Sequence, residues 1–406
     1  MLLSLRRRHL LKVGLGTIRI LFNHPPIMKK VILLFLTFLI STYTEAQQKK
    51  EILYVGTFSV RGSGGIYAYS FNRAKRTLTL LQTAPSLESP SYLAIHPSGK
   101  FLYSANRGKA DSADHGGSVS AYGIDPSTGM LSGLNHRSSY GDGPCYIGVD
   151  QTGKYIFVAN YNEGNLAVLS LFEDGLIGSP SDAKKYMGSS VNTERQQSPH
   201  IHAAVLSPDN KFLYVTDLGT DKIYIYEFNA SDGTLHSASS PNVHVASGTG
   251  PRHLAFHPSG NFVYLAEELT STVGVFAVDK STGALTILQD TVKSLPAKFT
   301  EKNSSAYIHT DVSGKYLFMS NRGSNTLSIY RIGEDGKITL VSHENTGGQI
   351  PRNFLVDPKG EFLFIANQDT DTINLFRFNS KTGKLSEVGK PVKVPSPVCL
   401  KLLTLN

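Results

Sequence analysis

Cysteine and tryptophan are scarce in this chain of 406 residues, which has two cysteines and no tryptophan. Two cysteines exclude a fold held by several disulfides and a zinc or iron–sulfur centre built from thiolates. The sequence also lacks a Gly-x-Ser-x-Gly nucleophile elbow and a His-Glu-x-x-His zinc motif. Charged residues make up only 18% of the chain and aromatic residues 10%, which excludes a disordered chain. We therefore expect a packed globular protein whose chemistry rests on other side chains.

The positive charge is concentrated at one end of the chain. The formal net charge is +8, but residues 1–46 contain seven basic residues and one acidic residue. The remaining chain has 33 basic and 31 acidic residues, and no run rich in Lys or Arg follows position 50. A nucleic-acid-binding surface needs clustered cations to neutralise phosphates. The sequence therefore predicts no nucleic-acid partner.

Residues 28–46 have the three parts of a secretory signal peptide. Met28-Lys29-Lys30 is basic, residues 31–40 are almost wholly apolar, and a short segment ending at Ala46 supplies the cleavage site. The apolar run is short for a bilayer span, although an uncleaved anchor is the alternative. We predict a true start at Met28, a leader over 1–46 and a single domain over 47–406. The mature protein would be periplasmic or secreted, without stable membrane insertion, or cytoplasmic if the leader is not functional.

One phrase recurs along the rest of the chain. It is clearest in His96-Pro-Ser-Gly-Lys-Phe-Leu-Tyr103 and Ser207-Pro-Asp-Asn-Lys-Phe-Leu-Tyr214. The turn residues of its six copies are Gly99, Gly153, Asn210, Gly260, Gly314 and Gly360. Each repeat reads as four short strands, of which the first usually begins just after a proline and the second is rich in Phe and Tyr. Antiparallel four-stranded units with a period of about 50 residues are typical of propeller blades.

The two ends of the repeat region complement each other. The first blade has no first strand before Ile52, whereas a seventh strand of this kind begins at Pro397. We predict that this C-terminal strand completes the N-terminal blade and closes a ring of seven blades without an open edge. An α/β fold is excluded because no segment of about 12 residues has sustained apolar spacing of 3.6 residues. The predicted fold is an all-β seven-bladed propeller.

Polar side chains should gather at one mouth of the channel. The start of strand one and the end of strand two lie at the same edge of a meander, and the innermost strands line the axis. The residues eight and seven positions before each turn residue are Ser91-Tyr92, Cys145-Tyr146, His202-Ala203, Arg252-His253, Ala306-Tyr307 and Arg352-Asn353. The ends of strand two add Asn106-Arg107, Asn160-Tyr161, Asp217, Glu267-Glu268, Asn321-Arg322 and Asn367-Gln368. Charged groups that converge in this way are costly unless they are paired or meet a ligand.

Two structural alternatives compete with a binding role. The candidates for substrate contact include His253, Asn353, Asn160 and Asn321, yet strand-end asparagines often cap turns. The arginines Arg252, Arg322 and Arg352 could form inter-blade salt bridges with Asp217, Glu267 and Asp369.

A cofactor is not required by any motif. His200-x-His202 places two imidazoles on one strand face and could hold a divalent metal, but a clear third ligand is missing. We predict no resident cofactor. Cys145 and Cys399 start strands two blades apart, so we expect two free thiols rather than a bridge.

The order and spacing of several phrases resemble one known family. They are Tyr54-Val-Gly-Thr57, Ser198-Pro-His-Ile-His202, Gly250-Pro-Arg-His253, Glu268-Leu269, Ser320-Asn-Arg-Gly323 and Pro351-Arg-Asn-Phe354. The chain resembles the seven-bladed propeller lactonases, which include the propeller type of 6-phosphogluconolactonase and the 3-carboxymuconate lactonising enzyme. The resemblance implies that His202, Arg252, Glu268 and Arg322 form the catalytic group and that Arg352 belongs to the same anion-binding cleft. The chain departs from the family at Tyr307, where the pattern usually has Glu.

Two classes of function follow. In the first, the protein hydrolyses an anionic sugar lactone, with His202 as general base or relay, Glu268 orienting it or the water, and Arg252 and Arg322 stabilising the oxyanion. Ring closure of an unsaturated dicarboxylate would use the same groups in reverse. In the second, the mouth only docks a ligand without chemistry. An exported enzyme would not meet cytosolic sugar phosphates, which favours an unphosphorylated or carboxylated lactone.

Overall fold

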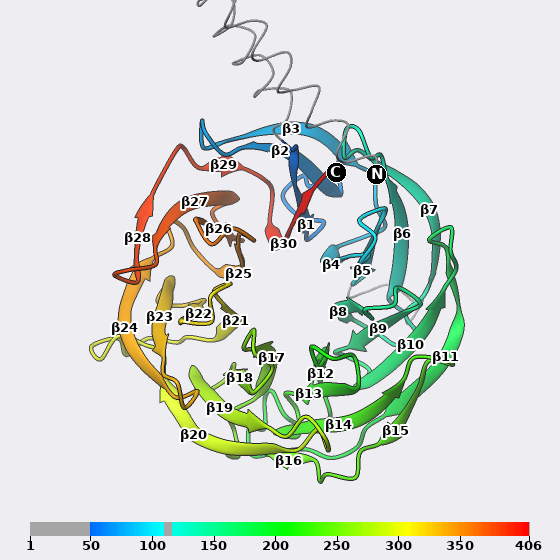
Figure 1. The fold of residues 1–406 in the computed structure, drawn as a ribbon, viewed down its shortest axis with the longest axis vertical. Coiled ribbons are helices and arrows are strands. Elements are labelled where there is room, and N and C mark those ends of the chain that lie inside the picture. The colour runs from blue at the N-terminus through cyan, green and yellow to red at the C-terminus, as the bar shows by residue number, and fades with distance from the viewer. Residues whose placement is uncertain (1–48, 109–115, 406) are drawn as a thin grey trace, which may run out of the picture. The chain divides into compact units, whose positions relative to one another are not determined.

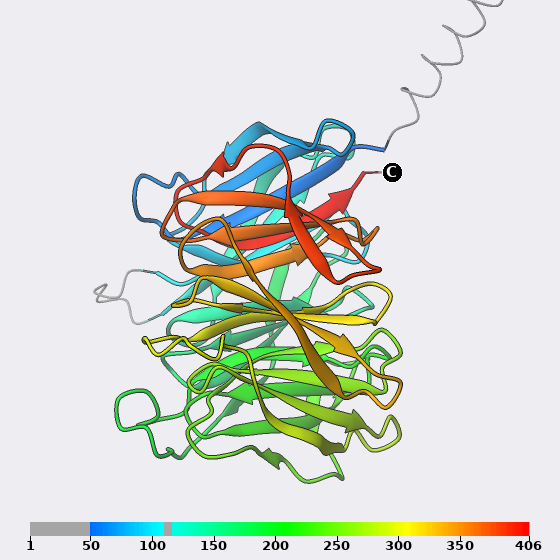
Figure 2. The same ribbon diagram turned by 90° about the vertical axis from the view of Figure 1, so that its left-hand side faces the viewer.

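The computed structural model describes residues 49–108 and 116–405, and every regular element within these ranges is a β-strand. These strands form seven antiparallel sheets that stand around a central axis (Figure 1). Figure 2 shows the sheets edge-on, packed face to face. The predicted all-β seven-bladed propeller is confirmed. The predicted leader lies outside the described residues, among which no helix is long and apolar enough to cross a membrane.

The blades follow one another in chain order. The strands are β1 (Glu51–Thr57), β2 (Ile66–Asn72), β3 (Thr77–Ala84); β4 (Pro90–Ile95), β5 (Phe101–Asn106), β6 (Ser118–Ile124), β7 (Leu131–Ser138); β8 (Pro144–Val149), β9 (Tyr155–Asn160), β10 (Asn165–Leu171), β11 (Ile177–Lys185); β12 (Ile201–Leu206), β13 (Phe212–Asp217), β14 (Lys222–Asn229), β15 (Thr234–Ser237), β16 (Val243–His244); β17 (Pro251–Phe256), β18 (Phe262–Glu267), β19 (Thr272–Val278), β20 (Leu285–Lys293); β21 (Ser305–Thr310), β22 (Tyr316–Asn321), β23 (Thr326–Ile332), β24 (Ile338–Asn345); β25 (Pro351–Val356), β26 (Phe362–Asn367), β27 (Thr372–Asn379), β28 (Lys384–Glu387), β29 (Val392–Lys393); and β30 (Pro397–Thr404).

The last strand closes the ring. β30 is the inner strand of the first sheet, whose order is β3-β2-β1-β30. It runs antiparallel to β1 along the whole of that strand, with Glu51 opposite Thr404 and Gly56 opposite Cys399. Figure 1 shows the red strand β30 beside the blue strand β1. The predicted completion of the N-terminal blade is confirmed.

Aromatic side chains of the second strands join each blade to the next. The hydroxyl of Tyr54 donates to the carbonyl of Gly129 at 2.7 Å, and Tyr264 makes the equivalent bond to Gly336 at 3.1 Å. Glycine is required at these turns for two reasons, which are the backbone conformation and the lack of space for a Cβ atom. Gly175, for example, has a φ of +84°, and a Cβ there would lie 2.3 Å from the ring of Phe101. These contacts fix how neighbouring blades meet and therefore how their inner strands are spaced at the channel.

Candidate active site

A β-bulge near the mouth marks the first strand of most blades. In β17, Pro251 pairs with Glu267 and His253 pairs with Ala266, so Arg252 is the extra residue. The same register shift occurs in four other blades, where the extra residue without a partner on the second strand is Ser91, Cys145, His202 or Arg352. Regular alternation would send Arg252 and His253 to opposite faces of the sheet. Because a bulge re-aims the side chain, both residues face the channel.

The bulged residues and their successors line one recess at the channel mouth. This recess is bounded by Ser91, Tyr92, Arg107, Cys145, His202, Arg252, His253, Arg352, Asn353 and Val398. It therefore contains five of the nine candidate site residues, namely His202, Arg252, His253, Arg352 and Asn353. Asn353 is also tied to the fold, because its Oδ1 accepts a hydrogen bond from the backbone N–H of Leu400 at 3.0 Å.

Glu268 and Arg322 join the recess through ion pairs. The buried carboxylate of Glu268 lies 2.5 Å from Nη1 of Arg252, 3.0 Å from Nη2 of Arg322 and 2.8 Å from Nη2 of Arg195. Burial raises the pKa of this carboxyl, but Arg322 and Arg252 more than offset the effect and hold its pKa well below the usual range. Glu268 is thus an anion that orders three arginines, and no hydrogen bond joins it to His202 among the described residues.

His202 and Arg252 contact each other directly. Nη1 of Arg252 lies 2.6 Å from Nε2 of His202, and Nε of Arg252 donates to the carbonyl of Ala306 at 2.9 Å. A guanidinium only donates, so Nε2 of His202 is the acceptor and its hydrogen lies on Nδ1. Burial and the nearby charge of Arg252 lower the pKa of His202 well below its ordinary value. His202 is therefore neutral, with its lone pair engaged by the arginine.

Arg352 is a cation of the recess without an ion pair among the described residues. Its guanidinium lies 5.1 Å from the ring centre of Phe58 and has no hydrogen-bond acceptor among the described residues. Burial, together with the charges of Arg252, Arg322 and Arg107, lowers its pKa well below the ordinary value. Since arginine does not lose its proton in proteins, Arg352 remains a buried cation beside other cations. Such a site favours an anion.

Two candidate residues lie elsewhere. Asn160 and Asn321 are fully buried and are not among the residues that line the recess. Nδ2 of Asn160 donates to the carbonyl of Ser139, and Nδ2 of Asn321 donates to the carbonyl of Ser294. Their side chains hold inter-strand loops, as the capping alternative proposed.

The alternative ring of salt bridges is wrong, because the three acidic residues predicted to pair with the channel arginines have other partners. Asp217 accepts hydrogen bonds from Thr220 and from the backbone of His200, and Glu267 accepts one from Thr272. Asp369 lies 3.8 Å from Arg61. Arg252 and Arg322 pair with Glu268 instead, and Arg352 makes no ion pair among the described residues.

Sequence reasoning did not assign Arg195, Tyr161 or Arg107 to the site. The hydroxyl of Tyr161 accepts a hydrogen bond from Arg195 at 3.1 Å, its ring stacks on His200 at 4.4 Å, and the Arg107 guanidinium lies 5.5 Å from the ring centre. Arg107 and Tyr161 stand in the predicted ring of strand-two ends, which was the available signal. Arg195 lies in the connection before β12, outside the repeat, and no motif points to it.

The described residues hold no group of three His, Cys, Asp or Glu side chains arranged to bind a metal ion. Nδ1 of His200 is engaged by the carbonyl of Tyr161 at 2.8 Å. Cys145 and Cys399 are free and buried, as predicted.

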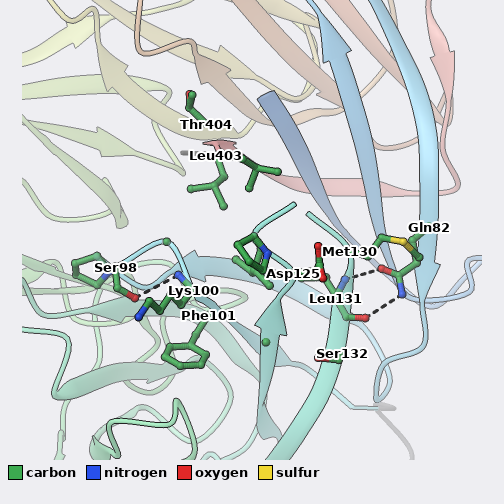
Figure 3. Close-up of a pocket in the computed structure, with 16 residues that line it drawn as sticks. Gln82, Ser98, Lys100, Phe101, Asp125, Met130, Leu131, Ser132, Leu403 and Thr404 are labelled. Atoms are coloured by element: carbon green, nitrogen blue, oxygen red, sulfur yellow. Dashed lines mark hydrogen bonds between the residues drawn. The ribbon is translucent and has the colours of Figure 1, made fainter. Parts of the chain in front are cut away.

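A larger cavity, of about 750 Å³, lies at the opposite edge between the first two blades (Figure 3). Gln82 spans part of its wall through two hydrogen bonds to the backbone of Leu131. The carboxylate of Asp125 is occupied by its own turn, through Ser127 and Thr128. Because acid–base groups do not converge there, the smaller arginine-lined recess is the better candidate active site.

Comparison with known proteins shows to which family the chain belongs. The model of the family described as lactonase, 7-bladed beta-propeller, matches residues 52–402. The chain belongs to the seven-bladed β-propeller lactonase family. Lactonases open a cyclic ester, so this protein is an enzyme of the carboxylic-ester hydrolase class.

Named relatives of this lactonase cover almost the whole propeller. It is 34% identical over 355 residues to the 6-phosphogluconolactonase of Bacillus subtilis, matching 87% of this chain and 99% of that protein. It is 32% identical over 359 residues to the 6-phosphogluconolactonase of Formosa agariphila, matching 87% of this chain and all of that protein. The solved structure of the periplasmic gluconolactonase of Pseudomonas aeruginosa matches with a TM-score of 0.83 and 32% identity, covering 88% of this chain and all of the other.

Proposed function

We propose that this lactonase hydrolyses the lactone of a polyhydroxy acid, of the gluconolactone or 6-phosphogluconolactone type, and that the substrate or its transition state is held as an anion. The observation that carries the proposal is the charge of the recess. Arg107, Arg252 and Arg352 line it, and Glu268 is the carboxylate shared by Arg252, Arg322 and Arg195. Positive charge therefore exceeds negative charge where the substrate would bind.

In the proposed reaction, water attacks the lactone carbonyl and its oxygen becomes an oxyanion. Arg252 is the main stabiliser of that charge, because Glu268, His202 and Ala306 fix its guanidinium in one orientation. A preorganised donor of this kind contributes about 3 kcal/mol to transition-state stabilisation. Glu268 acts as a positioning residue for Arg252 and Arg322 rather than for His202 or the water. Because its Nε2 lone pair is engaged by Arg252, His202 acts as a second positioning residue for that guanidinium.

Arg352 would bind an anionic group of the substrate away from the reacting carbon. Its guanidinium has no acceptor within the described chain, so it can pair with a carboxylate or phosphate without breaking an existing bond. A contact that is equal in ground and transition states changes KM rather than kcat.

The predicted cellular location narrows the substrate. The predicted signal peptide and the likeness to a periplasmic gluconolactonase support export. We therefore propose an unphosphorylated or carboxylated sugar lactone in the periplasm or outside the cell. Ring closure of an unsaturated dicarboxylate is the second candidate, because the same arginines would hold two carboxylates.

The test is a hydrolysis screen of the purified protein with gluconolactone, 6-phosphogluconolactone and a carboxylated lactone, each with and without chelator. We expect hydrolysis of at least one lactone. The variant Arg352→Ala should raise KM for the anionic lactones by about tenfold and change kcat little. A protein that binds lactones but turns none over in either direction would be a docking propeller instead.

A further inference from the structure

Beside the arginines, the recess holds a histidine whose acceptor nitrogen has no partner. His253 is 4% exposed. Its Nδ1 lies 3.1 Å from the carbonyl oxygen of Ala306, an atom that only accepts, so Nδ1 carries the hydrogen. Nε2 is therefore an acceptor, and it is buried without a hydrogen-bond partner in the described part of the chain. A buried lone pair left in this way is costly and indicates that a donor from outside the chain fits here.

The other histidine of the recess differs in this respect. Nε2 of His202 already accepts a hydrogen bond from Arg252 at 2.6 Å. A base whose lone pair faces a guanidinium cannot take a proton until that arginine moves. The rings of His202 and His253 lie 5.0 Å apart, so both can reach the same substrate, but the lone pair of His253 is the one that is free.

The surroundings hold the His253 ring in place. Tyr92, Tyr146 and Tyr307 lie around it with ring centres at 5.9, 6.2 and 5.3 Å. His253 also borders a second cavity further along the channel, which includes His309 and Lys401. His253 thus stands between the mouth and the interior of the channel, where a water molecule can be shielded from bulk solvent by a bound lactone.

Burial and two cations keep His253 neutral, and one anion acts in the opposite direction. The cations are Arg252 on its own strand and Arg352 from β25, and the anion is Glu268 after β18. Burial, then the positive charge of Arg252, lowers the pKa of His253 well below its ordinary value. The imidazole therefore remains available as a base throughout the neutral pH range.

We propose that Nε2 of His253 accepts the proton of the attacking water, an inference that rests on the proposed lactone hydrolysis. The water oxygen forms a bond to the carbonyl carbon, the carbonyl π pair moves to the oxygen beside Arg252, and the water proton passes to Nε2. The carbonyl then re-forms, the ring C–O bond breaks, and the departing ring oxygen takes the proton from Nε2. The products are the open hydroxy acid and a neutral His253, so protons and electrons balance.

The variant His253→Asn tests this role on the full chain. Its amide N–H can still donate to Ala306, but it has no basic nitrogen. With the best lactone of the screen, we expect kcat to fall by about 100-fold or more while KM changes by less than about threefold. After subtraction of the uncatalysed rate, kcat of the variant should rise about tenfold per pH unit between pH 7 and 9, as hydroxide replaces the base. The wild type should be nearly independent of pH there.

The control is His309→Asn, which changes a histidine of the second cavity whose Nδ1 bonds to the carbonyl of Thr310. It should keep wild-type kcat. If His253→Asn does not fold, His253→Gln replaces it, with the same expectation. Wild-type kcat in a folded His253 variant, or a loss that keeps the wild-type pH profile, would overturn the inference while leaving lactone hydrolysis intact. A wild type without lactone turnover would overturn the proposed function as well.

Discussion

Glu268 illustrates how a single buried charge organises the mouth. Removing a carboxylate from water costs several kcal/mol, which only well-aligned partners repay. Glu268 has three such partners, contributed by separate segments of the chain: Arg252, Arg322 and Arg195. In turn, the negative charge of Glu268 offsets the electrostatic repulsion among the three arginines. The carboxylate therefore converts a group of mutually repelling cations into a fixed set of donors.

The prediction at the scale of the residue concerns the shape of the Arg252 side chain rather than its charge. Arg252→Lys keeps the positive charge but loses the planar fork that reaches Glu268, His202 and Ala306 together. We expect kcat/KM for lactone hydrolysis to fall by about 100-fold, with a melting temperature within a few degrees of the wild type. The control Arg137→Lys, on the exposed face of β7, should match the wild type in both assays. A variant with wild-type kcat/KM would show that Arg252 is not the main stabiliser.

Among the elements, the inner strands with their bulges decide what the recess contains. The turn phrase repeats with such regularity that counting back from it located His202, Arg252 and Arg352 without coordinates. Their ion-pair partners could not be found in this way, because the choice of Glu268 over Asp217 or Glu267 depends on distances between blades.

The hydrogen-bond partners and tautomers of single residues could also not be predicted from the sequence. The roles of Asn160 and Asn321 depend on loop carbonyls at Ser139 and Ser294, which lie on the preceding connections. The tautomers of His202 and His253 depend on contacts with other blades. Arg195 reaches Glu268 from a connection without a repeat pattern. The sequence thus predicted positions along each strand and could not predict contacts between strands far apart.

The end of β18 provides a prediction at the scale of the element. Glu267 is fully buried, one carboxylate oxygen accepts from Thr272, and the other has no partner among the described residues. Burial raises its pKa to about 7. Between its ordinary pKa of 4.5 and about 7, the folded protein holds a proton that the unfolded chain has lost. The free energy of unfolding should therefore fall as the pH rises through this window.

Denaturant unfolding between pH 4.5 and 8 measures this effect in Glu267→Gln and in the wild type. The wild type should lose up to about 3 kcal/mol across the window from this group, and the variant should show a flatter dependence. Glu173→Gln, at an exposed turn position, should keep the wild-type slope. Parallel slopes for the wild type and Glu267→Gln would mean that Glu267 is ionised in the fold at low pH.

For the whole molecule, ring closure through β30 predicts an unusual sensitivity to truncation. Deleting residues 396–406 removes the inner strand of the first blade and leaves the inner edge of β1 unpaired. We expect loss of cooperative thermal unfolding or a melting temperature lower by well over 10 °C, whereas deletion of Asn406 alone should be neutral.

A rearranged chain sharpens this test. Because Thr404 lies opposite Glu51, the deleted segment can be placed ahead of Glu51 with a short turn between them. This rearranged chain should recover most of the melting temperature. Unchanged melting of the truncated chain would rule out the closing role of β30.

The second prediction for the whole molecule concerns its export from the cytoplasm. If residues 28–46 form a signal peptide, mass spectrometry of the protein from its native host should find an N-terminus near Gln47 in the exported fraction. Replacing Leu33 and Leu34 by Arg interrupts the apolar run and should retain the protein in the cytoplasm. Soluble cytoplasmic protein that begins at Met1 or Met28 would contradict export.

The pairing of β1 with β30 also determines when the first blade can be completed during synthesis of the chain. Roughly 340 residues separate the end of β1 from the start of β30. At a synthesis rate of about 5–20 residues per second, the ribosome needs roughly 20 to 70 seconds to supply the missing strand. Without β30 the first blade can form only three strands, with the inner edge of β1 open. The recess, to which β30 contributes Val398, is therefore complete only after the last strand has been made, and we expect no lactonase activity from an unfinished chain.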